Sequence, residues 1–190
     1  MASSPLTFLS EVLGRTGSLP YPEHFKFVIR QQLIDLLTDF TSLSVKVDSY
    51  AVSNDRRLEL LAVSGTLPMY YQGVRYNVPL QMWLSESFPL AAPAVFVVPT
   101  PLMIIRPGHP AVSPSGRVSS AYLSAWSYPR SSLRDGLEDL AICFGENPPL
   151  YSKPAGWGGD GGAGVAGRPS PPRPQARPPS QSPQQATSNP

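Results

Sequence analysis

The composition of this chain changes abruptly at Pro154, and the change limits which part of it can fold. Proline and glycine make up almost half of residues 154–190, where the only large apolar side chains are Trp157 and Val165. A segment with so few apolar side chains cannot bury enough surface to offset the entropy that is lost when it becomes ordered. We therefore predict one folded domain over residues 1–154 and a disordered Gly/Pro-rich C-terminal tail over residues 155–190.

The charged residues separate the same two parts. The chain has 15 basic and 13 acidic side chains, and the whole excess lies in the tail, where three arginines accompany one aspartate. The predicted domain is therefore neutral overall and lacks the basic surface that duplex nucleic acid requires. One cysteine and two histidines argue against a disulfide framework and against a structural zinc site. We expect no cofactor, no metal and no nucleic-acid partner.

The amino terminus and the apolar segments indicate the cellular compartment in which the protein is expected. No run is long enough to form a transmembrane segment, and the first residues lack the basic and apolar regions of a secretory signal. A cytoplasmic protein is therefore expected.

The spacing of apolar residues switches from helical to strand-like along the domain. A helical period predicts a short helix that begins after Ser4 and a longer helix over residues 23–40. Alternating and β-branched residues then predict four strands, over residues 43–52, 57–67, 74–84 and 94–98. A long loop over residues 99–130 precedes a last helix over residues 133–144, which Gly145 is expected to end. This order predicts an α+β fold in which helices pack on a four-stranded antiparallel meander.

The long loop contains a segment that resembles a known active site. Residues 109–119 read His-Pro-Ala-Val-Ser-Pro-Ser-Gly-Arg-Val-Ser, which is similar to the His-Pro-Asn…Cys segment of ubiquitin-conjugating enzymes. The family's asparagine is Ala111 here, and its catalytic cysteine is Ser119. Ubiquitin transfer needs a thiolate to carry the thioester and a donor to stabilise the developing oxyanion. We therefore predict a ubiquitin-conjugating-enzyme-like fold that is not an enzyme and has no catalytic residue.

Further short sequence motifs indicate one branch of this family. They occupy residues 64–68, 71–79, 83–89, 99–104 and 144–154. Together they resemble the ubiquitin-conjugating-enzyme-variant (UEV) domain of the tumour-susceptibility-gene/vacuolar-protein-sorting subunit of the ESCRT-I complex, and most of all its plant and green-lineage members. The resemblance implies binding of ubiquitin on cargo and of Pro-[Ser/Thr]-Ala-Pro peptides, during sorting into multivesicular endosomes. It also implies a cytoplasmic protein that is peripheral on endosomes, with other ESCRT-I subunits as partners if a longer chain exists.

The resemblance places two binding surfaces on the domain. A Pro-rich peptide is expected to bind Thr66, Tyr71, Tyr76, Asn77, Thr100, Met103, Pro149, Tyr151 and Ser152. Ubiquitin is expected to contact Ala51, Ser53, Asn54, Asp55, Trp83 and Phe96. Aromatic rings suit proline, which is already held in polyproline II geometry, and an aromatic anchor with a polar rim suits a weak interface. For each strand aromatic, packing on the core is the alternative role.

The first hairpin departs from the family. The usual Asn-Asp-Gly turn is absent, because Arg56 follows Asn54 and Asp55. A glycine tolerates the left-handed backbone of a tight turn and an arginine does not. The geometry of this part of the ubiquitin-facing surface is therefore left open.

Three alternatives remain open from the sequence. The domain could instead be a non-catalytic UEV cofactor that partners an active ubiquitin-conjugating enzyme in ubiquitin chain synthesis. Ser119 and Ser120 near His109 could suggest a serine hydrolase, although Gly-x-Ser-x-Gly and an evident orienting carboxylate are missing. In the tail, residues 168–174 fit a basic-x-x-Pro-x-x-Pro ligand for an SH3-type domain.

Overall fold

The structure is a computed structural model, and it describes residues 4–14, 18–53 and 55–153. Along the chain the elements are α1 (Pro5–Val12), α2 (Glu23–Asp39), β1 (Leu43–Ala51), β2 (Arg57–Tyr71), β3 (Val74–Trp83), β4 (Ala94–Val97), β5 (Met103–Ile105), α3 (Ala121–Ser124), α4 (Leu133–Glu146) and β6 (Leu150–Ser152). The α+β fold with a four-stranded antiparallel sheet is confirmed. The predicted disordered tail and its SH3-type ligand lie outside the described residues.

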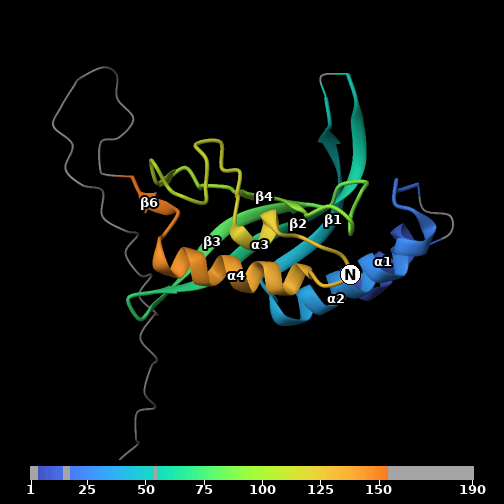
Figure 1. Cartoon of the computed structure of the whole chain (residues 1–190), viewed down its shortest axis with the longest axis horizontal. Coiled ribbons are helices and arrows are strands. Elements are labelled where there is room, and N and C mark those ends of the chain that lie inside the picture. Colours follow the sequence, from blue (N-terminus) through green and yellow to red (C-terminus); the bar gives the residue numbers. More distant parts are fainter. Residues whose placement is uncertain (1–3, 15–17, 54, 154–190) are drawn as a thin grey trace, which may run out of the picture.

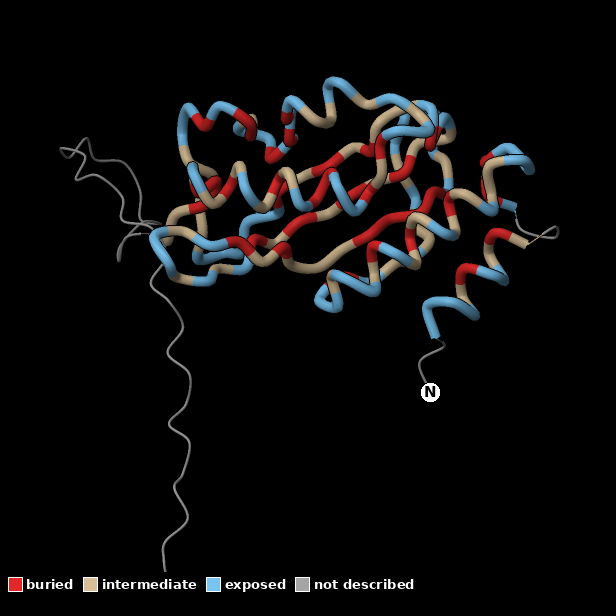
Figure 2. Tube along the Cα trace, turned by 60° about the horizontal axis from the view of Figure 1, so that its bottom comes forward, coloured by how far each residue is buried: buried red, intermediate tan, exposed pale blue. Residues whose placement is uncertain are grey.

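The sheet has the strand order β1-β2-β3-β4, and every neighbouring pair is antiparallel. Figure 1 shows α2 and α4 running along one face of it. Side chains alternate between the two faces of a strand, so Met82 and Val95, which oppose each other, point toward the helices and are almost fully buried. Leu33 of α2 and Phe144 of α4 are also completely buried, and Figure 2 shows buried positions on the strands and on the facing helices. The core therefore lies between the sheet and these two helices.

The last helix begins where the sequence predicts and ends later. Ser132 caps its first turn, since the hydroxyl oxygen accepts a hydrogen bond from Asp135 N at 3.1 Å. The prediction that Gly145 ends the helix was wrong, because α4 continues to Glu146. A Cβ atom at Gly145 would lie 2.6 Å from the carbonyl oxygen of Tyr70. The glycine therefore serves the close approach of α4 to β2 rather than the helix end.

The second strand is longer than predicted. It runs past Pro68 to Tyr71 and forms a two-residue turn with β3, in which Gln72 and Gly73 have φ values of 50° and 77°. The pairing of β1 with β2 ends at Gly65. Beyond that residue no strand of the described chain pairs with this edge of β2, so the missing N–H of Pro68 interrupts no ladder.

The region predicted as one loop over residues 99–130 contains two short elements, β5 and α3. Strand β5 pairs with β6, which follows the last helix and was also not predicted. Each of these strands has three residues, and they form a separate two-stranded sheet. Their pairing joins residues 45 to 49 positions apart, which local periodicity cannot indicate. No helix within the described residues is long and apolar enough to cross a membrane.

Candidate functional site

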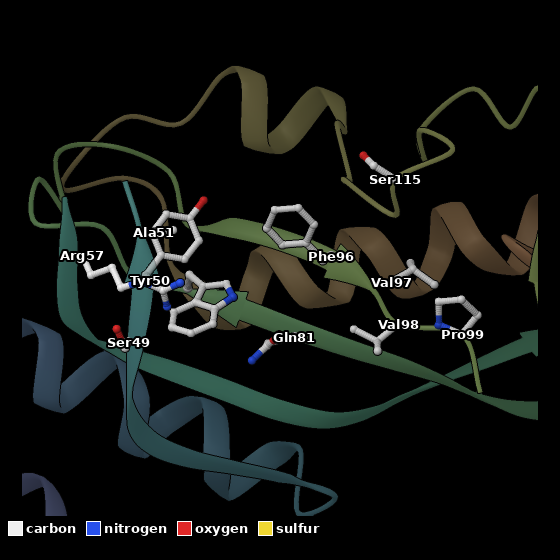
Figure 3. Close-up of a pocket in the computed structure, with 11 residues that line it drawn as sticks. Ser49, Tyr50, Ala51, Arg57, Gln81, Phe96, Val97, Val98, Pro99 and Ser115 are labelled. Atoms are coloured by element: carbon white, nitrogen blue, oxygen red, sulfur yellow. The ribbon is translucent and has the colours of Figure 1, made fainter. Parts of the chain in front are cut away.

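An open hollow of about 490 Å³ lies on the face of the sheet that points away from the helices, and its aromatic lining comes from Tyr50, Trp83 and Phe96. Figure 3 shows Tyr50, Gln81 and Phe96 projecting from β1, β3 and β4. Gln81 opposes Phe96 in the register, and Ala62 opposes Trp83, so these positions share one face. We call this hollow the aromatic hollow.

The two aromatic residues predicted to bind ubiquitin are only half-buried. The ring of Trp83 packs against that of Tyr50, with ring centroids 4.9 Å apart and an angle of 49°. The guanidinium of Arg117 lies over the Phe96 ring at 5.2 Å from its centroid. Each ring therefore contacts one neighbour while part of its surface stays accessible, and Trp83 also packs against the edge of the core.

Of the predicted hairpin residues that the structure describes, one lines the aromatic hollow and the other two do not. Ala51 lines it, and Ser53 and Asp55 are exposed beside the turn. The N–H groups of Val52 and Ser53 donate to the carbonyl oxygen of Arg56 at 2.9 and 3.2 Å, so the connection is tight without the family's glycine. Asn54, which was also predicted to bind ubiquitin, lies outside the described residues.

Arg56 forms an ion pair with a residue in the connection between β3 and β4. Its guanidinium forms an ion pair with Glu86 at 3.1 Å, and both side chains are about half exposed. Such a surface pair contributes little to stability, but it fixes where the arginine lies relative to the hairpin. The sequence did not indicate this contact, because the two residues are thirty positions apart.

The residues predicted to bind a Pro-rich peptide fall into two groups. One group lies on the hairpin of β2 and β3 and comprises Thr66, Tyr71, Tyr76 and Asn77. The other surrounds the pair of β5 and β6 and comprises Thr100, Met103, Pro149, Tyr151 and Ser152. Figure 1 shows β6 and the β2–β3 turn at the same end of the molecule. The register puts Thr66 and Asn77 on one face of the β2–β3 hairpin and Tyr71 and Tyr76 on the other. In the β5–β6 pair, Met103 and Ser152 likewise share one face and Tyr151 lies on the other. Contact of one peptide with both groups stays a prediction.

The second group is organised by strand pairing. Met103 directly opposes Ser152, and the carbonyl oxygen of Pro149 accepts a hydrogen bond from Arg106 N at 2.8 Å. The Arg106 guanidinium lies 5.8 Å from the centroid of the Tyr151 ring. Tyr151 therefore presents one face to a cation and remains only half-buried. The sequence offered no core role for this segment, and its pairing with β5 explains how it is held.

The segment that resembles an active site folds into a hairpin of its own. Val112 and Val118 form an antiparallel bridge, and Ser119 N donates to Ala111 O at 2.8 Å. At its turn Gly116 has a φ of 86°, and a Cβ atom there would collide with the Val97 carbonyl oxygen. Only glycine satisfies both conditions. The hairpin thus packs on β4 and leaves Ser119 exposed.

His109 is a structural link rather than a base for Ser119. Its Nδ1 accepts a hydrogen bond from Ala111 N at 3.1 Å, so the proton of the neutral ring sits on Nε2, which donates to Asn147 O at 2.8 Å. The side chain is 7% exposed, and its burial lowers the pKa of the imidazole below the usual value. Both ring nitrogens are occupied by backbone groups. This geometry removes the general base that a serine hydrolase would need.

We expect His109 to make the fold sensitive to acid. Because the pKa is lower in the folded state, the unfolded chain takes up the proton first as the pH falls below about 7. Stability should therefore decrease between about pH 7 and pH 5, at no more than about 1.4 kcal/mol per pH unit. Chemical denaturation of the wild type and of His109→Gln at both pH values checks this. An equal loss of stability in the two proteins would contradict it.

Comparison with known proteins decides the family. The model of the UEV domain family matches residues 18–152 of this chain. The chain belongs to the UEV domain family. Its four-stranded sheet is thus that of a UEV domain, as the resemblance implied. Residues 109–119, which resemble the active-site segment of conjugating enzymes, are called the vestigial hairpin below.

Curated relatives support the same branch. The UEV domain is 45% identical to "Protein ELC" of Arabidopsis thaliana over 148 residues, which are 77% of this chain and 37% of that protein. It is 34% identical to the "Tumor susceptibility gene 101 protein" of Mus musculus over 124 residues, which are 65% of this chain and 32% of that protein. The higher identity to the plant protein confirms the predicted likeness to plant members. The chain spans about a third of the length of these relatives.

Two solved structures have the same fold. One is the UEV domain of yeast vps23 in complex with a vps27 PSDP peptide, with a TM-score of 0.66 and 19% identity, which covers 78% of this chain and 95% of that chain. The other is a complex of the Vps23 UEV with ubiquitin, with a TM-score of 0.56 and 18% identity, which covers 73% of this chain and 94% of that chain. At such identities the likeness establishes the fold alone.

Proposed function

We propose that this UEV domain is a non-catalytic adaptor in ESCRT-I-dependent sorting of ubiquitinated membrane proteins into multivesicular endosomes. It binds ubiquitin on cargo through the aromatic hollow and a Pro-[Ser/Thr]-Ala-Pro peptide through the residues around the β2–β3 hairpin and the β5–β6 pair. The observation that carries the proposal is the pair of half-buried rings, Trp83 and Phe96, beside an exposed polar hairpin. This role places the protein in the cytoplasm and peripherally on endosomes.

The shape and lining of the aromatic hollow suit a weak protein partner. The hollow is open, its aromatic rings are held by Tyr50 and Arg117, and its rim carries Ser49 and Gln81. An apolar centre with a polar rim is the usual organisation of a protein–protein interface. The yeast domain of the same fold is itself complexed with ubiquitin, which supports ubiquitin as a ligand of this domain.

The peptide surface suits proline for a different reason. Tyr71, Tyr76 and Tyr151 are all half-buried, so their rings offer flat faces with little freedom left to lose. A proline-rich ligand is likewise preorganised, and the entropy lost on binding is therefore small. The yeast complex with a PSDP peptide supports a ligand of this kind.

The absence of a thiol at the vestigial site leads us to expect no conjugating activity. Ser119 takes the place of the nucleophile, and Ala111 takes the place of the oxyanion donor and is 6% exposed. A serine hydroxyl without a base is a weak nucleophile, and His109 is not free to serve as one. Incubation with activating enzyme, ATP and ubiquitin should leave Ser119 unmodified in mass spectrometry.

The variant Ser119→Cys provides the matched control for this prediction. We expect it to transfer ubiquitin inefficiently, because the oxyanion donor is still missing at Ala111. A ubiquitin adduct on Ser119 of the wild type would show the assignment to be wrong. Faster chain synthesis after adding the wild type to an active conjugating enzyme would support the cofactor role over the adaptor role.

A pair of titrations tests the proposed function itself. The 190-residue chain is titrated with ubiquitin and with a Pro-Thr-Ala-Pro peptide, and binding of both is expected. Tyr71→Ala should weaken peptide binding by about fivefold or more, since an anchor of this type contributes over about 1 kcal/mol, and should leave ubiquitin binding unchanged. If folded Tyr71→Ala lost both ubiquitin binding and peptide binding, the two ligands would share one surface and the proposal of two surfaces would be wrong.

A further inference from the structure

A second cavity, of about 760 Å³, lies between β5 and the vestigial hairpin. Its apolar wall is formed on one side by Met103 and Ile105 and on the other by Pro110, Val112 and Pro114. It is larger than the aromatic hollow. In a conjugating enzyme this hairpin would position the nucleophile, but here it packs against β4 and closes one side of an apolar space.

The rim of this cavity is cationic. Arg106, Arg117 and Lys153 line it, and none of its lining residues is acidic. Within the described residues none of the three takes part in an ion pair. Arg106 and Arg117 lie instead over the rings of Tyr151 and Phe96. A cavity that has three basic residues and no acidic residue in its lining favours an anionic ligand that also carries an apolar group.

The cavity continues the proposed peptide surface. Met103 belongs to both, and Lys153 follows Ser152 directly in the chain. Lys153 N donates to the carbonyl oxygen of Leu102 at 2.8 Å, so the backbone at this point is fixed beside β5. The proposed peptide surface therefore adjoins the cavity at Met103 and at Lys153.

We propose that this cavity binds an acidic and apolar segment that flanks the proline-rich core of the peptide ligand. A carboxylate of the segment meets Arg106, Arg117 and Lys153, and a neighbouring apolar side chain enters the space between Ile105 and Val112. This inference rests on the proposed peptide binding and adds a specificity that the core motif lacks. It selects ligands by the charge and the hydrophobicity of the residues beside the motif.

A membrane surface fits the same charges less well. Recognition of anionic lipids by electrostatics uses clusters of about four to eight basic residues near the membrane, and this rim has Arg106, Arg117 and Lys153 as its basic residues. The apolar lining lies in a concave space rather than on an exposed helix face. A peptide side chain can enter such a space, whereas a bilayer surface cannot follow it.

The test compares extended peptides on the 190-residue chain. Pro-Thr-Ala-Pro is extended, at each end in turn, by Gly-Ser-Glu-Leu-Glu, by Gly-Ser-Gln-Leu-Gln or by Gly-Ser-Glu-Ser-Glu. From one of the two ends the Glu-Leu-Glu extension is expected to improve affinity about tenfold over Gln-Leu-Gln. Glu-Ser-Glu should lose part of this gain, because the apolar side chain is missing. The gain should shrink as salt is added.

Variants of the basic rim residues test whether their charges contribute to binding of the acidic extension and not to binding of the core motif. Arg117→Gln combined with Lys153→Gln should reduce the advantage of Glu-Leu-Glu at least threefold and leave the affinity of the unextended core peptide unchanged. Arg106 is kept, because it packs on Tyr151 of the peptide surface. Arg134→Gln, which removes a cation that is paired with Glu138 on α4 at 3.3 Å, is the matched control and should change neither affinity.

The outcomes distinguish this inference from the proposed function. Equal affinities for Glu-Leu-Glu and Gln-Leu-Gln at both ends, with the core peptide still bound, would overturn the inference alone. No binding of the core peptide would overturn the proposed peptide binding and this inference with it. The protein is also sedimented with vesicles of equal parts phosphatidylcholine and phosphatidylserine. If the wild type sedimented with them, the double variant did not, and the peptides showed no preference, the rim would bind a membrane and the inference would be overturned too.

Discussion

Trp83→Ala should weaken ubiquitin binding by about 2 kcal/mol, or roughly thirtyfold in Kd. The indole is the largest side chain of the aromatic hollow and packs on Tyr50 with ring centroids 4.9 Å apart. Its truncation removes the apolar centre of the proposed interface and also leaves Tyr50 less constrained. Isothermal titration calorimetry with ubiquitin measures the effect.

Phe27→Ala is the matched control for this substitution. Phe27 is an aromatic residue on α2 that is 70% exposed, and it lies on the side of the molecule that the helices cover. We expect ubiquitin binding to be unchanged by its truncation. If ubiquitin binding were unchanged in Trp83→Ala and weakened in Phe27→Ala, the ubiquitin surface would lie on the helices and not on the sheet.

Phe144→Ala should lower the free energy of unfolding by about 3–5 kcal/mol. Its ring is completely buried in α4 and meets the His109 ring edge to face at 6.1 Å between centroids. The substitution removes a large apolar side chain and leaves a cavity between the helix and the vestigial hairpin. For a domain of ordinary stability this is a large fraction of the total.

Ile142→Ala tests whether burial causes this effect. Ile142 lies two positions earlier on the same helix and is 68% exposed, so its truncation should change the free energy of unfolding by no more than about 0.5 kcal/mol. Urea denaturation followed by circular dichroism measures both variants. Similar losses in the two variants would mean that α4 does not pack on the sheet as described.

The larger elements could be predicted because their signals are local. Apolar residues recur at helical spacing from Glu23 to Asp39, and alternation marks the four strands, so one face of each element is specified by neighbouring residues. Strands β5 and β6 could not be found in this way. Each has three residues and forms only because a distant segment supplies its partner. The role of Gly145 was missed for the same reason, since the contact with Tyr70 is not encoded beside it.

Some residues of the candidate site could likewise be predicted from the sequence, and others could not. The resemblance placed Trp83 and Phe96 on the ubiquitin-facing surface, and the structure groups them with Ala51 around one hollow. Tyr50 and Arg117, which hold these two rings, were missed. Alternation along β1 could have indicated Tyr50, because it shares a face with the other outward residues. Arg117 carries no such signal, since the fold of the vestigial hairpin alone brings it to β4.

The central claim is that two separate surfaces bind ubiquitin and a proline-rich peptide. The most direct test is chemical-shift mapping on the ¹⁵N-labelled 190-residue chain, with ubiquitin added first and a Pro-Thr-Ala-Pro peptide added once ubiquitin is saturating. We expect ubiquitin to shift the amides around Ala51, Trp83 and Phe96, and the peptide then to shift those around Tyr71 and Tyr151 without reversing the first set. Reversal of the ubiquitin shifts by the peptide, or one common set of shifted amides, would contradict the account.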